Sequence, residues 1–172
     1  ESGVEPARGR AAGLGGSGDA DLEKLKNLVD QLGAQEDHVE DFEIVREPTR
    51  DQVAKLALLK AYAELTIGLN VKNRLFAFRG RGALGINFNG GAIGVHEKVL
   101  ESGFDEAIKT FTHEVAHNAT MSHGLLFVQV EEALFTATSD RLYEIGDKTR
   151  RGEDLTSDEH VLLALEERWN NL

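Results

Sequence analysis

Hydrophobic residues recur at three- and four-residue spacing along much of this chain, which is the pattern of amphipathic helices. We therefore predict helices at residues 21–32, 49–68, 103–118, 124–145 and 156–170. Two of these helices carry start signals, because Thr49 is placed to cap one of them and Thr156 with Glu159 forms a capping box for another. Gly33 and Gly68 follow two of the segments as stop signals. We expect the helix that Thr49 opens to pack against the helix at 103–118.

Shorter apolar runs bounded by turn residues predict a small sheet as well. We expect strands near residues 74–78, 83–88 and 92–95, and a short strand near 42–46. The sequence Asn89-Gly90-Gly91 has the composition of a tight hairpin turn between two of them. Gly85 and Gly94 lie inside the strands, which indicates either a close fit of the sheet over a helix or room for a peptide that docks as an added strand. Helices and a small sheet together predict an α+β fold.

The first residues have a different composition from the rest. Residues 1–18 hold six of the 18 glycines and few apolar side chains, so we predict a flexible linker there and a folded domain at 19–172. A domain of this length is long enough to bury a core without disulfides or a structural metal. The first residue is Glu1 rather than Met, which suggests that the sequence is a fragment, a processed product or an excised domain of a longer protein.

Charge and composition narrow the class of partner. The net charge is −11, from 30 acidic and 19 basic residues, and such a chain repels the phosphates of nucleic acids. A local basic strip of Lys72, Arg74, Arg79 and Arg81 is interpreted as a solvated hairpin edge rather than a nucleic-acid site. No apolar run approaches the length of a membrane span, and the chain has no cysteine. We expect no membrane contact and favour a cytoplasmic location.

The strongest chemical signal is the HExxH motif at residues 113–117. Side chains four residues apart lie on one helix face, so His113 and His117 can both direct a ring nitrogen to one metal ion about 2 Å away. Glu114 lies about 100° round the helix, within reach of a water at the metal but not a ligand itself. Both histidines lie off the apolar stripe of Phe104 to Phe111, so core packing does not explain them.

A third ligand is needed, because catalytic zinc sites use three protein ligands and leave one position for water. His123 follows His113 by ten residues and is the preferred candidate. The alternative is a Glu from the next helix, where Glu131, Glu132 and Glu144 are available. His123 and Glu131 are separated by two helical turns, roughly 12 Å, so only one of them can bind the same ion. The remaining histidines, His38, His96 and His160, are expected to be surface or hydrogen-bonded residues.

The spacing of His123 matches the metzincin pattern, but two other features of that class are missing. Thr120 occupies the position of the metzincin glycine, and the single methionine, Met121, precedes the third histidine instead of following it in a Met-turn. An accidental HExxH is the competing explanation, and the third histidine argues against it. Phe127, four residues after His123, is expected to anchor this turn in the core.

The segment from His113 through Asn118 to His123, Gly124 and Phe127 resembles the WLM and Spartan/SprT families of compact zinc metalloproteases. The WLM form has an HExxHN motif, five residues between the second and third His, and an aromatic residue four positions after the third His. This segment matches all three features, whereas SprT proteins usually have a longer gap before the third His. The strands before the motif resemble the sheet edge of those families, and the resemblance covers about 45 residues, 83–127. It implies a small zincin-like (minigluzincin) domain, in which a short twisted sheet packs against the HExxH helix with additional helices.

Two functions follow from these residues. The first is a zinc-dependent peptidase, in which His113, His117 and His123 hold Zn²⁺ and Glu114 is the general base in the hydrolysis of a polypeptide substrate. The second is a non-catalytic zinc-binding or interaction module of a larger protein, in which Glu131 or Glu132 completes the metal site. Contact with nucleic acid is expected only through other regions of a parent protein.

Overall fold

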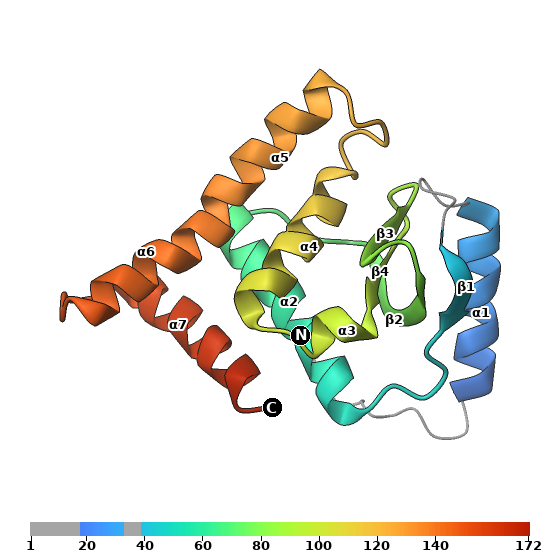
Figure 1. Ribbon diagram of the computed structural model, residues 1–172, viewed down its shortest axis with the longest axis horizontal. Helices are drawn as coiled ribbons and strands as arrows, with labels where there is room; N and C mark the ends of the chain where they lie inside the picture. Colours follow the sequence, from blue (N-terminus) through green and yellow to red (C-terminus); the bar gives the residue numbers. More distant parts are fainter. Residues whose placement is uncertain (1–17, 33–38) are drawn as a thin grey trace.

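The computed structural model describes residues 18–32 and 39–172, and this part of the chain has an α+β fold (Figure 1). The predicted linker therefore lies outside the described residues, apart from Gly18, as do Gly33 and His38. The elements are α1 (Gly18–Leu32), β1 (Glu40–Ile44), α2 (Arg50–Ile67), β2 (Arg74–Arg81), β3 (Gly85–Phe88), β4 (Ala92–His96), α3 (Glu97–Leu100), α4 (Phe104–Ala116), α5 (Leu125–Ala137), α6 (Ser139–Arg150) and α7 (Ser157–Asn170).

Within the described residues, four strands form one mixed sheet in the order β1-β2-β4-β3. The two central strands, β2 and β4, run parallel, while β1 and β3 pair antiparallel at the edges. The predicted hairpin joins β3 to β4, and its turn residues Asn89 and Gly90 have φ angles of 51° and 81°. Two positive φ angles in succession are the geometry of a type I′ turn, which explains the Asn-Gly sequence.

The sheet has a hydrophobic cluster on each face because its side chains alternate in direction. Phe76, Phe78 and Ile86 pack toward Leu22 and Leu25 of α1. The sheet residues on the opposite face pack toward the other helices. They belong to a larger core that includes Leu59, Tyr62, Ile93, Val95, Ile108 and Phe111. Figure 1 shows α1 on one side of the sheet and α2 to α7 on the other. The predicted contact between α2 and α4 is confirmed, with the rings of Tyr62 and Phe104 at 5.1 Å.

Both predicted N-terminal caps are present. The Thr49 hydroxyl accepts a hydrogen bond from the backbone N–H of Gln52, and the Gln52 side chain accepts one from the N–H of Thr49. Thr156 and Glu159 form the same reciprocal pair at the start of α7. Gly68 ends α2 with a φ of 82°, a conformation that glycine adopts without strain.

The helix predicted at 124–145 is not continuous. It is broken at Thr138, whose φ and ψ are −105° and −78°, and α6 then continues to Arg150. The break is stabilised by contacts from other helices, since the Tyr62 hydroxyl donates to the Thr138 carbonyl at 2.9 Å and the Thr112 and Thr138 hydroxyls lie 3.1 Å apart. The turn after α4 also differs from the expected helix end, because α4 ends at Ala116 rather than Asn118.

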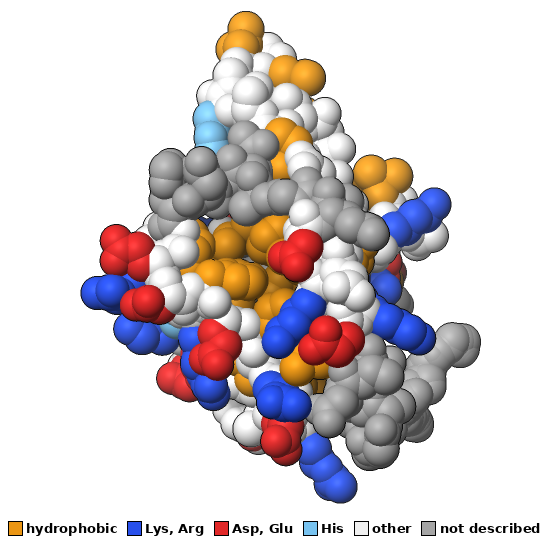
Figure 2. All heavy atoms as spheres, turned by 90° about the vertical axis from the view of Figure 1, so that its right-hand side faces the viewer, with side chains coloured by type: hydrophobic (Ala, Val, Ile, Leu, Met, Phe, Trp, Pro, Cys, Tyr) orange, Lys and Arg blue, Asp and Glu red, His pale blue; other side chains and the backbone are white. Residues whose placement is uncertain are grey.

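The basic strip lies on β2 and just before it, where Arg74 pairs only with β4 and Arg79 and Arg81 pair only with β1. Arg79 pairs with Glu97, and Arg81 pairs with Glu40 and Asp41. Figure 2 shows that Lys, Arg, Asp and Glu side chains alternate around a central hydrophobic area on this face of the molecule. Arg79 and Arg81 are therefore partners of nearby carboxylates, which fits a mixed surface better than a phosphate-binding one. No helix in the described part of the chain is long and apolar enough to cross a membrane.

Candidate metal centre

The three histidines of the predicted site meet at the C-terminal end of α4. His113 lies in the last turn of this helix, His117 is its C-cap residue, and His123 comes from the loop that leads to α5. Each can offer a ring nitrogen so that all three ligand atoms lie within 4.8 Å of one another. His117 is buried, His113 is half-buried and His123 is exposed. The cluster is therefore anchored on one side and open to solvent on the other.

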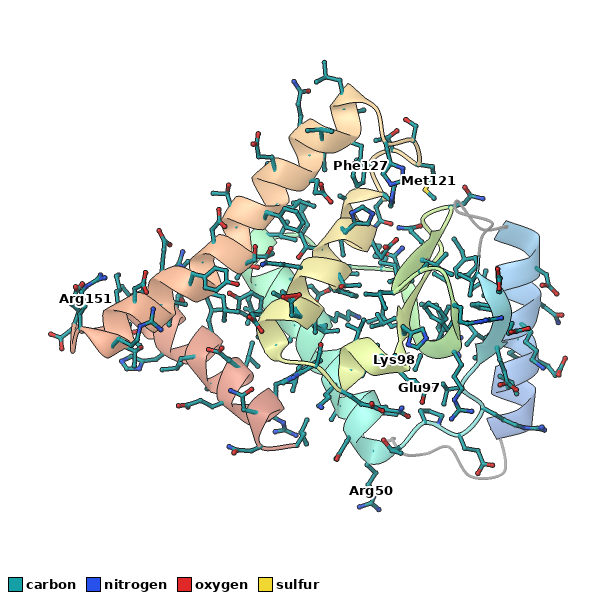
Figure 3. All side chains as sticks on the ribbon, in the orientation of Figure 1. Arg50, Glu97, Lys98, Met121, Phe127 and Arg151 are labelled. Carbon is teal, nitrogen blue, oxygen red and sulfur yellow. The ribbon has the colours of Figure 1, made fainter. Side chains whose placement is uncertain are left out.

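Phe127 holds the three imidazole rings together. Its ring lies 5.1 Å from that of His113, 4.3 Å from His117 and 4.9 Å from His123, measured between ring centroids. The side chain is 2% exposed, so the predicted role of Phe127 as a core anchor is confirmed. Figure 3 shows Phe127 directed from α5 toward the loop on which Met121 lies. One aromatic residue thus fixes the loop of His123 against the helix that carries His113 and His117.

Two of the rings are oriented by hydrogen bonds from their Nδ1 atoms. Nδ1 of His117 lies 3.1 Å from the Thr120 carbonyl, and Nδ1 of His113 lies 2.5 Å from Oε2 of Glu131. A carbonyl can only accept, so His117 carries its proton on Nδ1, and Nε2 is the nitrogen with the lone pair. The Nε2 atom of His113 faces Oε2 of Glu114 at 4.0 Å. Both rings are thus set to coordinate through Nε2.

Glu114 is held between α4 and the edge strand β3. Its side chain is only 7% exposed although it lies beside the solvent-facing histidines. Asn87 of β3 donates a hydrogen bond of 2.7 Å to its backbone carbonyl. A Cβ atom on Gly85 would lie 2.9 Å from Cγ and 3.0 Å from Oε2 of Glu114, closer than such atoms approach. Of the two interpretations of Gly85, the close fit over the helix is confirmed.

Gly94 is explained in the same way by a neighbour in the sheet. A Cβ atom there would lie 2.9 Å from Cζ of Phe76 and 3.0 Å from Cδ1 of Phe78. Both glycines therefore allow aromatic or charged side chains to pack directly on the strand backbone.

Three asparagines lock the end of α4 to the sheet. Oδ1 of Asn118 accepts hydrogen bonds from Nδ2 of Asn73 at 2.9 Å and from Nδ2 of Asn87 at 2.8 Å. In return, Nδ2 of Asn118 donates to Oδ1 of Asn73 at 2.7 Å. Asn73 and Asn87 also bond to Gly90 in the hairpin turn. The sequence pointed to Asn118 only as part of the family-like motif, and gave no sign of its two partners, which lie 45 and 31 residues away.

The remaining histidines and the alternative glutamate ligands are not part of the triad. His96 is buried, with Nε2 donating to the Gly80 carbonyl and Nδ1 accepting from the backbone of Lys98, so it is a satisfied structural residue as expected. His160 is exposed, and His38 lies outside the described residues. Glu131, Glu132 and Glu144 do not belong to the cluster of potential metal ligands. Among the described residues, the histidine triad is the group of three or more side chains that is placed to hold a metal.

The donor set fits zinc. Zinc–nitrogen bonds of about 2.0–2.1 Å in a tetrahedron place the ligand nitrogens about 3.4 Å apart. The ligand nitrogens of the triad lie within 4.8 Å of one another, and His123 is exposed, so a tetrahedral site would require only a small movement of its ring. Three neutral imidazoles with one open position are a donor set that zinc prefers over the harder cations, which take oxygen ligands.

Comparisons with known proteins give no support from relatives. No model of a known protein family matches the chain, and neither the curated proteins nor the solved structures yielded a significant match. The resemblance to the WLM and Spartan/SprT families is therefore carried by the motif residues alone.

Proposed function

We propose that this chain is a zinc-dependent peptidase domain with a zincin-like arrangement, in which His113, His117 and His123 hold the metal. One observation carries this proposal: the three imidazoles lie together, and the buried carboxylate of Glu114 lies 4.0 Å from Nε2 of His113. The Glu114 side chain is buried beside these histidines, with its carboxylate close to the ring of His113. It is suited to exchange protons with a water molecule at the site.

In this proposal the metal and the side chains of the protein have separate roles in the reaction. Bound zinc lowers the pKa of a water molecule and polarises the scissile carbonyl. Glu114 accepts the proton of the attacking water and delivers it to the amine that leaves when the peptide C–N bond breaks. Asn87 holds the backbone of Glu114, Gly85 lets the Glu114 side chain pack against β3, and Phe127 packs against the three rings. Each of these residues limits motion of a group that takes part in the reaction.

The edge strand beside Glu114 supports a polypeptide substrate. The backbone N–H of His96 donates to the carbonyl of Leu84, so these two residues form a hydrogen-bonded pair. Along the antiparallel strands β3 and β4, hydrogen-bonded pairs alternate with pairs that are not hydrogen-bonded. The N–H and C=O groups of Gly85 and Asn87 then face away from β4, and no described strand pairs with that edge. All four residues of β3 are buried, so a substrate in extended conformation would add to β3 only if this edge opened, and its backbone would then lie next to Glu114.

The alternative, a non-catalytic zinc module, is less well supported. Structural zinc sites are closed by four protein ligands, and the cluster in the described residues has three. Glu131, which with Glu132 is one of the two residues that could complete such a site, contacts the Nδ1 side of His113 instead. The net charge of −11 favours a polypeptide over a nucleic acid as the direct partner, so we propose contact with nucleic acid only through other regions of a longer protein.

The test is metal-dependent cleavage. The zinc-loaded protein, the chelator-treated protein and the chelator-treated protein with zinc restored are each incubated with an unfolded protein substrate. Cleavage that disappears with the chelator and returns with zinc supports the peptidase. A protein that binds zinc but cleaves no unfolded substrate in any arm supports the non-catalytic module instead.

A further inference from the structure

A short polar contact joins a histidine of the triad to a carboxylate on another helix. Oε2 of Glu131, on α5, lies 2.5 Å from Nδ1 of His113, on α4. The Glu131 side chain is 23% exposed and that of His113 is 32% exposed, so the pair is shielded from bulk water on most sides. A carboxylate can only accept from a neutral ring, so the proton of His113 lies on Nδ1 in this contact.

The position of Glu131 on α5 follows from the way that this helix docks. Phe127 is the buried residue of α5, and Glu131 follows it by four residues, so both lie on the face that meets α4. Leu125, Leu126 and Val128 are more than half exposed, so α5 does not dock through a broad apolar face. Phe127 and Glu131 are the residues through which α5 reaches the histidine cluster.

We infer that Glu131 is a positioning residue of the metal centre rather than its third ligand. This inference rests on the proposed metal site and extends it. Glu131 holds the ring of His113 so that Nε2 points to the metal position, and its negative charge makes that nitrogen a better donor. Glu131 and Glu114 lie on opposite sides of the same ring, bonded to Nδ1 and 4.0 Å from Nε2. A side chain on the Nδ1 side cannot also bind a metal at Nε2.

The inference predicts an order of zinc affinities. Loss of a carboxylate behind a ligand histidine typically weakens metal binding about 10- to 100-fold. Glu131→Gln keeps an oxygen acceptor for the Nδ1 proton but removes the charge, whereas Glu131→Ala removes both. The expected order of affinity is therefore wild type, then Glu131→Gln, then Glu131→Ala. Glu132→Gln is the matched control, since this exposed neighbour has the same charge and lies outside the cluster.

Zinc affinity is measured by competition with a chelator, and thermal unfolding of the metal-free variants shows whether each one is folded. Glu131→Ala should bind zinc about 10- to 100-fold more weakly, and Glu132→Gln should match wild type. Equal affinity of Glu131→Ala and wild type would overturn the inference. Loss of zinc binding by Glu131→Gln, together with retention of zinc binding by His123→Ala, would also overturn the inference, because that result would make Glu131 a ligand.

A second measurement does not depend on metal or on activity. Nitrogen chemical shifts of the metal-free protein, at a pH where the ring is neutral, report which nitrogen of His113 carries the proton. We expect the proton on Nδ1 in wild type and Glu131→Gln, and a shift toward Nε2 in Glu131→Ala. The same tautomer in all three proteins would contradict the role of Glu131. Absence of zinc binding by wild type, with the expected tautomers, would instead contradict the metal site alone.

Discussion

Nδ2 of Asn87, on the edge strand, donates a hydrogen bond of 2.7 Å to the backbone carbonyl of Glu114, in the last turn of α4. The Glu114 carbonyl also accepts from the backbone N–H of His117, the C-cap residue, so Asn87 adds a bond from the sheet to this helix end. The same amide group bonds to Asn118 at 2.8 Å. A single side chain therefore fixes the distance between β3 and the residue that we propose as the general base.

Removal of Asn118 should loosen this connection. Asn118→Ala deletes an acceptor of two hydrogen bonds and a donor of a third, and leaves the amides of Asn73 and Asn87 with fewer partners. We expect a loss of about 1–3 kcal/mol in the free energy of unfolding, measured by urea denaturation. Asn118→Asp keeps the acceptors but not the donor, so its loss should be smaller. Equal stability of Asn118→Ala and wild type would show that the network is not stabilising.

Gly85→Ala should damage the site with little change elsewhere. The new methyl group would lie 2.9 Å from Cγ of Glu114, so either β3 or the glutamate has to move. Overpacking of this kind costs about 1–3 kcal/mol. The matched control is Gly146→Ala in α6, where the nearest atom is 3.5 Å away, and there the helix should gain about 0.5–1 kcal/mol. Thermal unfolding of both variants checks the prediction, which fails if they shift in the same direction.

Acid should weaken the connection between α6 and α7. The hydrogen bond from Lys148, followed by that from the backbone of Thr156, lowers the pKa of Glu159 to about 2. Because the folded-state pKa lies below the unfolded value, this stabilisation is present above about pH 4.5 and is lost as the pH falls toward 2. The difference in melting temperature between metal-free wild type and Glu159→Gln should therefore shrink from about pH 6 to about pH 3. Asn170→Ala, an exposed change of an uncharged side chain in the same helix, should show no such trend.

Zinc binding itself should need the two histidines of α4. We expect one zinc per chain for wild type and none for His113→Ala/His117→Ala, measured by metal analysis after dialysis. Affinity should fall as the pH falls, because protons compete with the metal for the imidazole nitrogens. His160→Ala, at an exposed histidine outside the cluster, is the control and should keep its zinc. Stoichiometric zinc in the double variant would place the metal elsewhere.

Local signals predicted the parts of the fold that depend on neighbouring residues. The caps at Thr49 and Thr156, the Asn89-Gly90 turn and the convergence of His113, His117 and His123 all follow from short-range sequence patterns, and the structure contains each of them. The pairing of β1 with β2, and the parallel pairing of β2 with β4, had no such signal, since strand order depends on contacts between distant segments.

The features that the sequence did not predict are set by tertiary contacts. The helix break at Thr138 depends on Tyr62, which lies 76 residues earlier, whereas the apolar spacing continues through the break. Asn87 lies in a strand, where a polar residue alone suggests a solvent-facing position, yet it is buried against α4. Glu131 was a ligand candidate because the apolar periodicity does not show which face of α5 meets α4. The side of His113 that Glu131 reaches depends on that face.

The central claim is that Glu114 is the base of a zinc peptidase. Glu114→Gln preserves the size of the side chain but cannot accept a proton, and loss of a positioned base lowers a rate about 10²- to 10⁴-fold. The decisive measurement compares the cleavage rate of an unfolded protein by zinc-loaded wild type, Glu114→Gln and Glu106→Gln, an exposed control on the same helix. We predict that all three bind one zinc and that only Glu114→Gln loses cleavage. Equal cleavage by Glu114→Gln and wild type would contradict the account.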